Sequence, residues 1–294
     1  MAGDPPGRGT APVALVTGAA RGIGAATVAA LAARGWRIVA VDRCADDPAL
    51  PYPLGTRAEL AAVADAANAA AAGTPGDGTA ERDDAAERDG PPAGNVIAVV
   101  ADTRDTAALA GAVAEAERRW GGLDAAIAAA GVMAGGVPAW QVPPEQERAV
   151  LETNLTGVLH LARAAVPALL RRPQPRRGRF LAVASAAAAR GLPMLAAYCA
   201  AKAGVTGFIR ALAAELGGTG VTVNAVSPGS TATPMLGESA RLYGLAAAGD
   251  FATQQPLGRL LRPAEVAAVL AFLASDEASG MTGAIVPVDG GLSL

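Results

Sequence analysis

The chain has 294 residues, of which 52% are hydrophobic and 17% charged, so it can bury a sizeable core and is not expected to be globally disordered. A formal net charge of −3, with no basic tract beyond Arg171–Arg172 and Arg176–Arg177, argues against nucleic acid as a main partner. No apolar run is long and unbroken enough to span a bilayer, and the N-terminus is polar and rich in Pro and Gly, so we expect a cytoplasmic protein without membrane contact.

Short apolar strands alternate with helical stretches along the chain, after a predicted flexible arm at 1–11. The predicted strands cover 12–18, 36–42, 95–102, 123–131, 180–185, 221–229 and 284–291. The predicted helices cover 19–35, 56–72, 106–121, 144–171, 194–216 and 263–275, with a variable helical flap at 234–252. This alternation predicts a doubly wound, Rossmann-like three-layer α/β fold around a seven-stranded parallel sheet.

Residues 43–94 interrupt the alternation. Thr56-Arg-Ala-Glu59 has the form of a capping box and predicts the start of a helix. Residues 74–94 are rich in Gly, Pro, Asp and Glu, so we expect a mobile surface loop, with a functional lid as the alternative. The sequence therefore predicts one domain over 12–294 with an insertion at 43–94.

The turn between the first strand and the first helix is rich in glycine, and Arg21 and Ile23 lie within it. Gly18 permits a tight turn, Gly22 lets the backbone approach a pyrophosphate, and Gly24 lets the helix pack on the sheet. The helix N-terminus adds free N–H groups and the positive end of its dipole. In this strand–turn–helix context the glycines predict a dinucleotide site.

An acidic residue, Asp42, ends the second strand. Its carboxylate can accept both adenosine ribose hydroxyls and would repel a 2′-phosphate, which favours NAD over NADP. Arg43 and Arg21 are the opposing signals, because either could pair with a phosphate. Asp102, followed by Thr103, ends the third strand, where it is equally suited to accept from the adenine amine or to cap the strand end.

Ser185, Tyr198 and Lys202 are the candidate catalytic residues. Tyr198 and Lys202 are four residues apart and share one face of a helix, while Ser185 ends a strand. An ammonium beside a phenol lowers a pKa that is otherwise near 10, which would suit the tyrosine to move a hydroxyl proton. Chance spacing in an Ala-rich helix is the alternative interpretation.

No metal site is predicted. Cys44 and Cys199 have neither metal-binding nor redox spacing and are expected to be free thiols. His160 is the only histidine and, with leucines on both sides, is interpreted as structural.

Taken together, TGAARGIG at 17–24, Asn154, the Ser, Tyr and Lys set and Pro228-Gly229 resemble the classical short-chain dehydrogenase/reductase family over about residues 12–291. The resemblance implies that Tyr198 is the catalytic acid/base, Ser185 orients the substrate oxygen, and Lys202 lowers the tyrosine pKa and contacts the nicotinamide ribose. Asn154 would position a water that links the lysine to solvent. Further cofactor contacts implied are Ala129, Gly131, Pro228, Gly229, Thr231 and Thr233.

The family's usual Asn-Asn-Ala-Gly is replaced by Ala128-Ala129-Ala130-Gly131. Folding should survive, because alanine leaves no unpaired polar group, but the cofactor geometry is expected to differ slightly.

A narrower resemblance covers residues 41–66, which are similar to the mycofactocin-associated subfamily. It implies that NAD(H) stays bound and that electrons leave through the redox carrier mycofactocin. The stretch from Cys44 to Tyr52-Pro53 would lie near the adenosine end and could cover the cofactor. Family analogy also suggests a homotetramer built on helices 144–171 and 194–216.

The predicted pocket walls are mostly apolar and carry no fixed charge, so we expect a small hydrophobic secondary alcohol or its ketone as substrate. The residues concerned are Val132, Met133, Trp140, Leu192, Met194, Met235, Leu236, Tyr243 and Phe251. The alternatives are an ordinary carbonyl reductase with exchangeable NAD(P)H and, from another class, a catalytically silent nucleotide-sensing or scaffold protein.

Overall fold

The structure, a computed structural model, describes residues 11–72 and 94–294. The strands are β1 Val13–Thr17, β2 Arg37–Asp42, β3 Val96–Val100, β4 Ala125–Ala128, β5 Arg179–Val183, β6 Thr222–Pro228 and β7 Ile285–Val288. The helices are α1 Gly22–Ala32, α2 Arg57–Ala72, α3 Thr106–Trp120, α4 Pro144–Leu151, α5 Gly157–Arg171, α6 Ala196–Glu215, α7 Pro234–Leu242 and α8 Pro263–Leu273.

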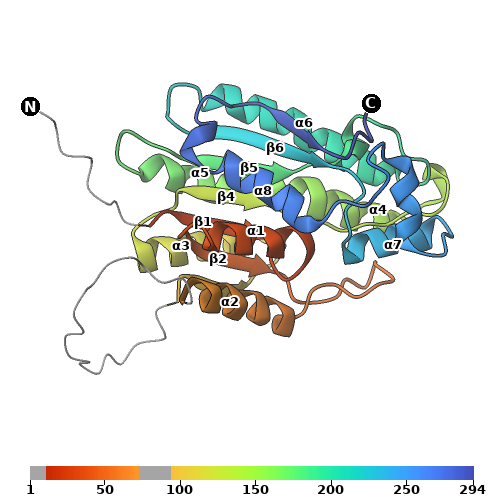
Figure 1. The fold of residues 1–294 in the computed structure, drawn as a ribbon, viewed down its shortest axis with the longest axis horizontal. Coiled ribbons are helices and arrows are strands. Elements are labelled where there is room, and N and C mark those ends of the chain that lie inside the picture. Colours follow the sequence, from red (N-terminus) through yellow and green to blue (C-terminus); the bar gives the residue numbers. More distant parts are fainter. Residues whose placement is uncertain (1–10, 73–93) are drawn as a thin grey trace, which may run out of the picture.

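The described strands form one seven-stranded sheet in the order β3-β2-β1-β4-β5-β6-β7, with every pair parallel (Figure 1). The predicted fold class is therefore confirmed. The order reverses between β1 and β4, and at such a switch point the carboxyl ends of the strands border a crevice.

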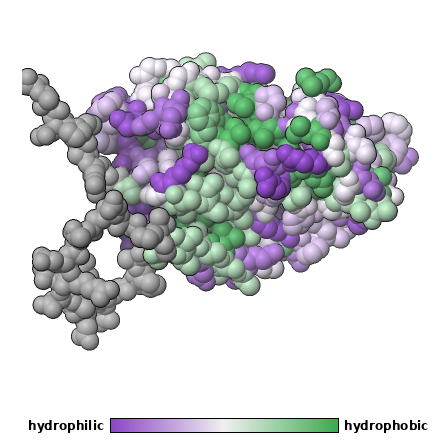
Figure 2. Space-filling model, in the orientation of Figure 1, coloured by the Kyte–Doolittle hydropathy of each residue, from purple (hydrophilic) through white to green (hydrophobic). Residues whose placement is uncertain are grey.

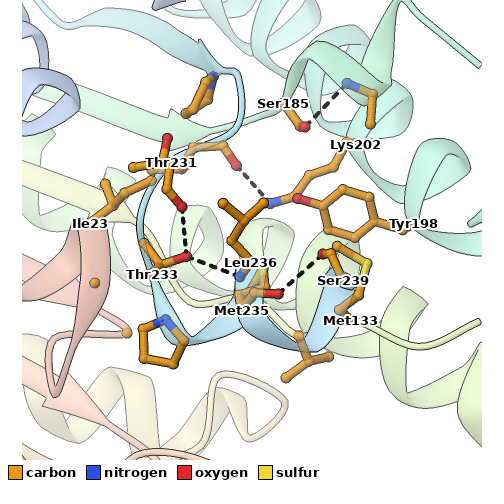
Figure 3. A pocket seen from close by; sticks show the side chains of 18 of the residues that line it. Ile23, Met133, Ser185, Tyr198, Lys202, Thr231, Thr233, Met235, Leu236 and Ser239 are labelled. Atoms are coloured by element: carbon orange, nitrogen blue, oxygen red, sulfur yellow. Dashed lines mark hydrogen bonds between the residues drawn. The ribbon is translucent and has the colours of Figure 1, made fainter. Parts of the chain in front are cut away.

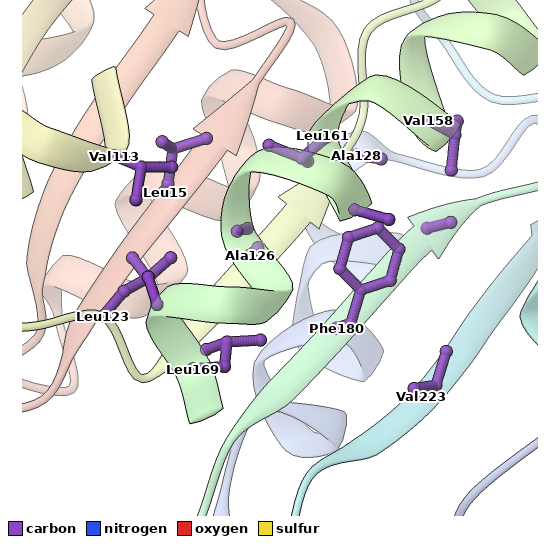
Figure 4. Close-up of a cluster of buried hydrophobic side chains, with 14 of the residues drawn as sticks. Leu15, Val113, Leu123, Ala126, Ala128, Val158, Leu161, Leu169, Phe180 and Val223 are labelled. Carbon is purple, nitrogen blue, oxygen red and sulfur yellow. The ribbon is translucent and has the colours of Figure 1, made fainter. Parts of the chain in front are cut away.

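Helices cover both faces of the sheet because the central strands bury side chains on both sides. In β1, Val13 and Leu15 join the core under α3, α5 and α6, while Ala14 and Val16 join the core under α1, α2 and α8. Figure 4 shows the first of these cores, where Leu161 and Leu169 of α5 lie over the sheet near Phe180. Many contacting residues are alanines, which lets helices approach the sheet closely.

The start of α2 confirms the capping-box prediction. The backbone N–H of Glu59 donates to Thr56 Oγ1 at 3.2 Å, and the N–H of Thr56 donates back to Glu59 Oε2 at 2.7 Å. These two bonds satisfy N–H groups that a helix N-terminus otherwise leaves without partners.

One predicted helix differs from the structure. Instead of running unbroken over 144–171, the segment consists of α4, a π-helical turn at Glu152–Thr156, and α5. A π turn holds an extra residue and is common at functional sites, and here it contains Asn154. The flap at 234–252 is divided into α7 and a 3₁₀ segment at Ala248–Gln254.

The predicted flexible arm at 1–11 and the mobile loop at 74–94 lie outside the described residues, apart from Ala11 and Gly94. Within the described ranges, none of the helices is both long and apolar enough to cross a membrane. On the face that carries α1 and α8, hydrophobic residues gather near the C-terminus among more hydrophilic ones (Figure 2).

Leu123→Ala should lower the free energy of unfolding by about 2–5 kcal/mol, because Leu123 is fully buried and its truncation leaves a cavity. Leu257→Ala is the matched control, since Leu257 is 57% exposed, and should cost less than about 1 kcal/mol. Urea unfolding followed by circular dichroism would measure both. Equal losses at the two positions would contradict the described core.

Candidate active site

A cavity of about 710 Å³ lies at the carboxyl ends of the strands. Every residue named above as a cofactor contact lines it, from Gly18 in the first turn to Thr233 before α7. Ser185, Tyr198 and Lys202 line the same cavity (Figure 3). Residues from distant parts of the sequence thus meet at one site.

The glycine-rich turn has no room for a side chain at Gly18 or Gly24. Gly18 has a φ of +67°, and a Cβ there would lie 2.6 Å from the Cα of Ala130. A Cβ on Gly24 would lie 2.0 Å from the carbonyl oxygen of Gly18. The backbone therefore borders the cavity directly at the N-terminus of α1, which suits a bound pyrophosphate.

Asp42 is held in place by the backbone at the end of β2. Its two carboxylate oxygens accept from the N–H groups of Ala20 and Cys44, each at 3.1 Å. Arg21, one of the opposing signals for NADP, donates from Nη2 to the carbonyl of Pro53 at 2.7 Å.

Arg43, the other opposing signal, belongs to a network of alternating charges. It contacts Asp47 at 2.8 Å and Asp102 at 3.2 Å, and Arg104 contacts each of the same two carboxylates at 2.8 Å. Burial opposes ionisation of Asp47 and Asp102, but hydrogen bonds from neighbouring N–H groups and the two arginines prevail and lower both pKa values. Arg43 is thus paired with two carboxylates of this chain. Asp102 accepts hydrogen bonds from both the guanidinium and the backbone N–H of Arg104.

The segment from Arg43 to Gly55, which we call the strap, extends further than expected. Its Tyr52 hydroxyl accepts a hydrogen bond from the N–H of Met133 at 2.7 Å, beyond the end of β4. Leu50 lies in the same hydrophobic cluster as Met133 and Tyr198. The strap therefore spans from the adenosine end, where it was predicted, to the catalytic side of the cavity.

Tyr198 and Lys202 lie on one face of α6, as predicted from their spacing, and both are buried. Lys202 Nζ donates to the carbonyl of Val183 at 2.8 Å and lies 5.7 Å from the centre of the Tyr198 ring. Ser185 follows β5, and its Oγ accepts the N–H of Ala187 at 3.1 Å. The Ser185 hydroxyl lies close enough to Tyr198 to influence the pKa of its phenol.

The pKa of Tyr198 differs from the sequence-based expectation. Burial raises it to about 12, and only the hydrogen bond with Ser185 acts strongly in the other direction. Burial lowers the pKa of Lys202 to about 8, so its charged form is itself disfavoured. The expected lowering of the tyrosine pKa by the lysine is therefore wrong, because desolvation is the stronger effect.

Asn154 does not line the cavity. It is fully buried in the π turn, where its Nδ2 donates to the carbonyls of Val132 and Val150 at 2.8 and 2.9 Å. Its Oδ1 accepts the N–H of Val132 at 3.1 Å and would lie 2.8 Å from a Cβ on Gly131. The side chain thus braces the backbone that follows β4.

The backbone of the Ala128-Ala129-Ala130-Gly131 stretch is held in part by Thr17. Thr17 Oγ1 accepts the N–H groups of Ala129 and Ala130 at 3.2 and 3.3 Å. Two threonines follow β6. Thr231 Oγ1 donates to the carbonyl of Gly229, and Thr233 caps α7 by accepting the N–H of Leu236.

Two predicted wall residues were wrong. Trp140 lies on a 3₁₀ turn, Ala139–Gln141, and is 84% exposed. Met194 does not line the cavity; it has a φ of +63°, and its carbonyl accepts the N–H of Gly136. The remaining predicted wall residues line the cavity: Val132, Met133, Leu192, Met235, Leu236, Tyr243 and Phe251.

Sequence reasoning missed several lining residues, among them Arg190 and Leu292. Leu292 carried no signal, because only the fold brings the C-terminal tail to the cavity. Arg190 could have been suspected as a cation five residues after Ser185. Within residues 11–72 and 94–294 no group of three or more acidic, His or Cys side chains could hold a metal, and His160 Nδ1 contacts the carbonyl of Thr103 at 3.2 Å.

The chain matches two family models. Residues 12–72 match the one described as short chain dehydrogenase, and residues 58–293 match the one described as enoyl-(acyl carrier protein) reductase.

Three similar proteins illustrate the range of relatives. A monensin polyketide synthase putative ketoacyl reductase of Streptomyces virginiae is 37% identical over 96% of this chain and 97% of its own. A cis-4-hydroxycyclohexanecarboxylate dehydrogenase of Sinomonas cyclohexanicum is 36% identical over 95% of both chains. The crystal structure of carveol dehydrogenase from Mycobacterium avium in complex with NAD is 30% identical, with a TM-score of 0.83 over 97% of this chain and 99% of that one.

Lys202→Met should remove a pH dependence of stability. The folded pKa of about 8 is below the ordinary 10.5, so between these values the unfolded chain binds a proton that the folded chain does not. Wild-type stability should therefore rise by about 2 kcal/mol relative to the variant between about pH 7 and pH 10. Urea unfolding of both proteins across this range would measure the difference, and parallel curves would disprove the buried ammonium.

Proposed function

Because the chain belongs to the short-chain dehydrogenase/reductase family, we propose that it interconverts a hydrophobic secondary alcohol and its ketone, with NAD as cofactor. The observation that carries the proposal is that Ser185, Tyr198 and Lys202 line the same cavity as the glycine-rich turn. The absence of side chains on Gly18, Gly22 and Gly24, together with Asp42 at the end of β2, fits a dinucleotide. When bound, NAD supplies the acceptor or donor of hydride.

The side chains of the cavity have separate roles in binding the substrate and moving its proton. Ser185 and Tyr198 together hydrogen-bond the substrate oxygen, and Tyr198 moves its proton. The neutral phenol favoured by burial suits proton donation to a ketone. In the oxidising direction the phenolate is required, and the hydroxyl of Ser185 favours it. Asn154 acts as a positioning residue through the backbone of Val132.

NAD is favoured over NADP by the charges at the adenosine end. Asp42 lines the cavity with its carboxylate fixed, and it would repel a 2′-phosphate. Arg43 is paired with Asp47 and Asp102, and Arg21 donates to Pro53, so neither is as available to a phosphate as the sequence suggested. The bound NAD of the carveol dehydrogenase structure is consistent with this choice.

We further propose that NAD(H) is tightly held and that mycofactocin reoxidises it. The strap supports this proposal, because it is attached at both ends of the cavity: by the Arg43 charge network and by the Tyr52 hydroxyl at Met133. Release of nucleotide would require at least one of these attachments to open. A homotetramer built on α4, α5 and α6 and a cytoplasmic location complete the proposal, with residues 12–294 acting as one domain.

An ordinary carbonyl reductase with exchangeable NAD(P)H is the second candidate. The similarity to a putative ketoacyl reductase favours it, since that name denotes reduction of a ketone. A silent nucleotide-sensing or scaffold protein is less well supported, because it would have no need for Ser185, Tyr198 and Lys202 to meet beside the dinucleotide site.

The substrate is proposed to be a small cyclic alcohol or ketone. The cavity walls are largely apolar, and two of the relatives are named for cyclic alcohols, carveol and 4-hydroxycyclohexanecarboxylate. Carveol is uncharged, whereas 4-hydroxycyclohexanecarboxylate carries a carboxylate.

Tyr198→Phe should lower turnover by about 10²–10⁴-fold, the range typical of a general acid/base group, while nucleotide binding is retained. The substitution removes only the hydroxyl that moves the proton. Turnover with cyclic alcohols, measured with NAD and a redox dye, tests the first part, and nucleotide content tests the second. Activity close to wild type would disprove the assignment.

Protein purified without added nucleotide and then denatured should release close to one NAD or NADH per chain, identified by chromatography and mass. Tyr52→Phe should speed the loss of nucleotide during dialysis by about 10-fold, because removing the acceptor of a buried N–H costs about 1–3 kcal/mol and weakens the closed strap. Empty wild-type protein that turns over alcohols with added nucleotide would support the exchangeable reductase instead. Release of NADP would contradict the role given to Asp42.

A further inference from the structure

We propose, building on the function above, that Arg190 binds an anionic group of the substrate. The substrate class would then be a secondary alcohol or ketone on a compact apolar body that carries a carboxylate at its far end.

The position of Arg190 is defined by two hydrogen bonds. Its backbone N–H donates to the carbonyl of Ala186 at 2.9 Å, which places it one turn beyond Ser185. Its Nη1 donates to the carbonyl of Leu292 at 2.9 Å, and Arg190 and Leu292 both line the cavity. The guanidinium is thus held near the catalytic serine by a partner that carries no charge.

The charges of the cavity are unevenly distributed. Its acidic lining residues, Asp42 and Asp102, lie at the adenosine end. Among the described residues Arg190 makes no ion pair with an acid, whereas Lys202, the other cation near Ser185, is buried and bound to the carbonyl of Val183. The substrate side therefore has a solvent-exposed cation that makes no ion pair within the described residues.

The chemistry of the guanidinium matches a carboxylate. It has five N–H donors in a planar fork, and the bond to Leu292 uses one of them. The remaining donors can bind both oxygens of a carboxylate, and a bound apolar ring would exclude water and strengthen the pair. The lining of the same cavity includes Leu192, Met235, Leu236 and Phe251, which suit an apolar ring.

A purely structural role, in which Arg190 only anchors the C-terminal tail, is the competing explanation. Loss of an anchor would weaken acids and neutral analogues alike. Loss of an anion site would weaken only acids. The decisive measurement is therefore a comparison of matched charged and neutral ligands.

Binding of cyclohexanecarboxylate and cyclohexanecarboxamide would be measured by calorimetry on the nucleotide-loaded protein. Wild type should prefer the carboxylate by about 10–100-fold, the range expected for a hydrogen-bonded charge, and added salt should reduce the preference. Arg190→Gln should abolish the preference while changing amide affinity by less than about 3-fold, and Arg190→Lys should retain part of it. Arg34→Gln is the control. Arg34 is exposed and precedes the amino end of β2, whereas the cavity lies at the carboxyl ends of the strands.

Equal binding of acid and amide by wild type, or a preference that survives in Arg190→Gln, would overturn the proposal. This test needs no turnover, so it does not depend on the proposed reaction. Oxidation of 4-hydroxycyclohexanecarboxylate and of its methyl ester then tests the role of Arg190 and the proposed reaction together. An anion preference in binding without oxidation of any alcohol would keep the role of Arg190 and reject the proposed reaction.

Discussion

The geometry of the catalytic side depends on one buried charge. An ammonium in a protein interior is strongly destabilising unless it finds an acceptor, and Lys202 finds the carbonyl of Val183 at the end of β5. This bond fixes the position of α6 along the sheet. Tyr198, one helical turn earlier, is then placed beside Ser185, which follows the same strand. A single strand end thereby positions all three side chains.

The two ends of the cavity are stabilised by different interactions. At the adenosine end, Arg43, Asp47, Asp102 and Arg104 neutralise one another in a partly exposed network, where each pair alone would contribute little. At the catalytic end the walls are apolar and water is more readily excluded, so any charge there has a stronger effect. The strap joins these environments, because Arg43 belongs to the charge network and the Tyr52 hydroxyl accepts the N–H of Met133.

Local patterns predicted most of the fold and many of the residues that line the cavity, because strand alternation, the glycine turn and the Tyr/Lys spacing are properties of adjacent residues. The predictions that failed concern residues whose environment is set by contacts with distant parts of the chain. Trp140 and Met194 lie in irregular segments, whose side-chain directions follow no period. Arg190 acquires its environment from Leu292, which is 102 residues away in sequence. The pKa of Tyr198 is set by burial, which sequence spacing does not report.

The π turn at Glu152–Thr156 also separates two helical registers. Successive residues of an α-helix are rotated by about 100°, so the additional residue lets α4 and α5 present different faces to their neighbours. On one side of the turn Val150 packs in the cluster with Tyr198, and on the other Leu161 packs on the sheet. A one-residue deletion in this turn would rotate one face away from its partner, so the length of the segment is constrained more strictly than its composition.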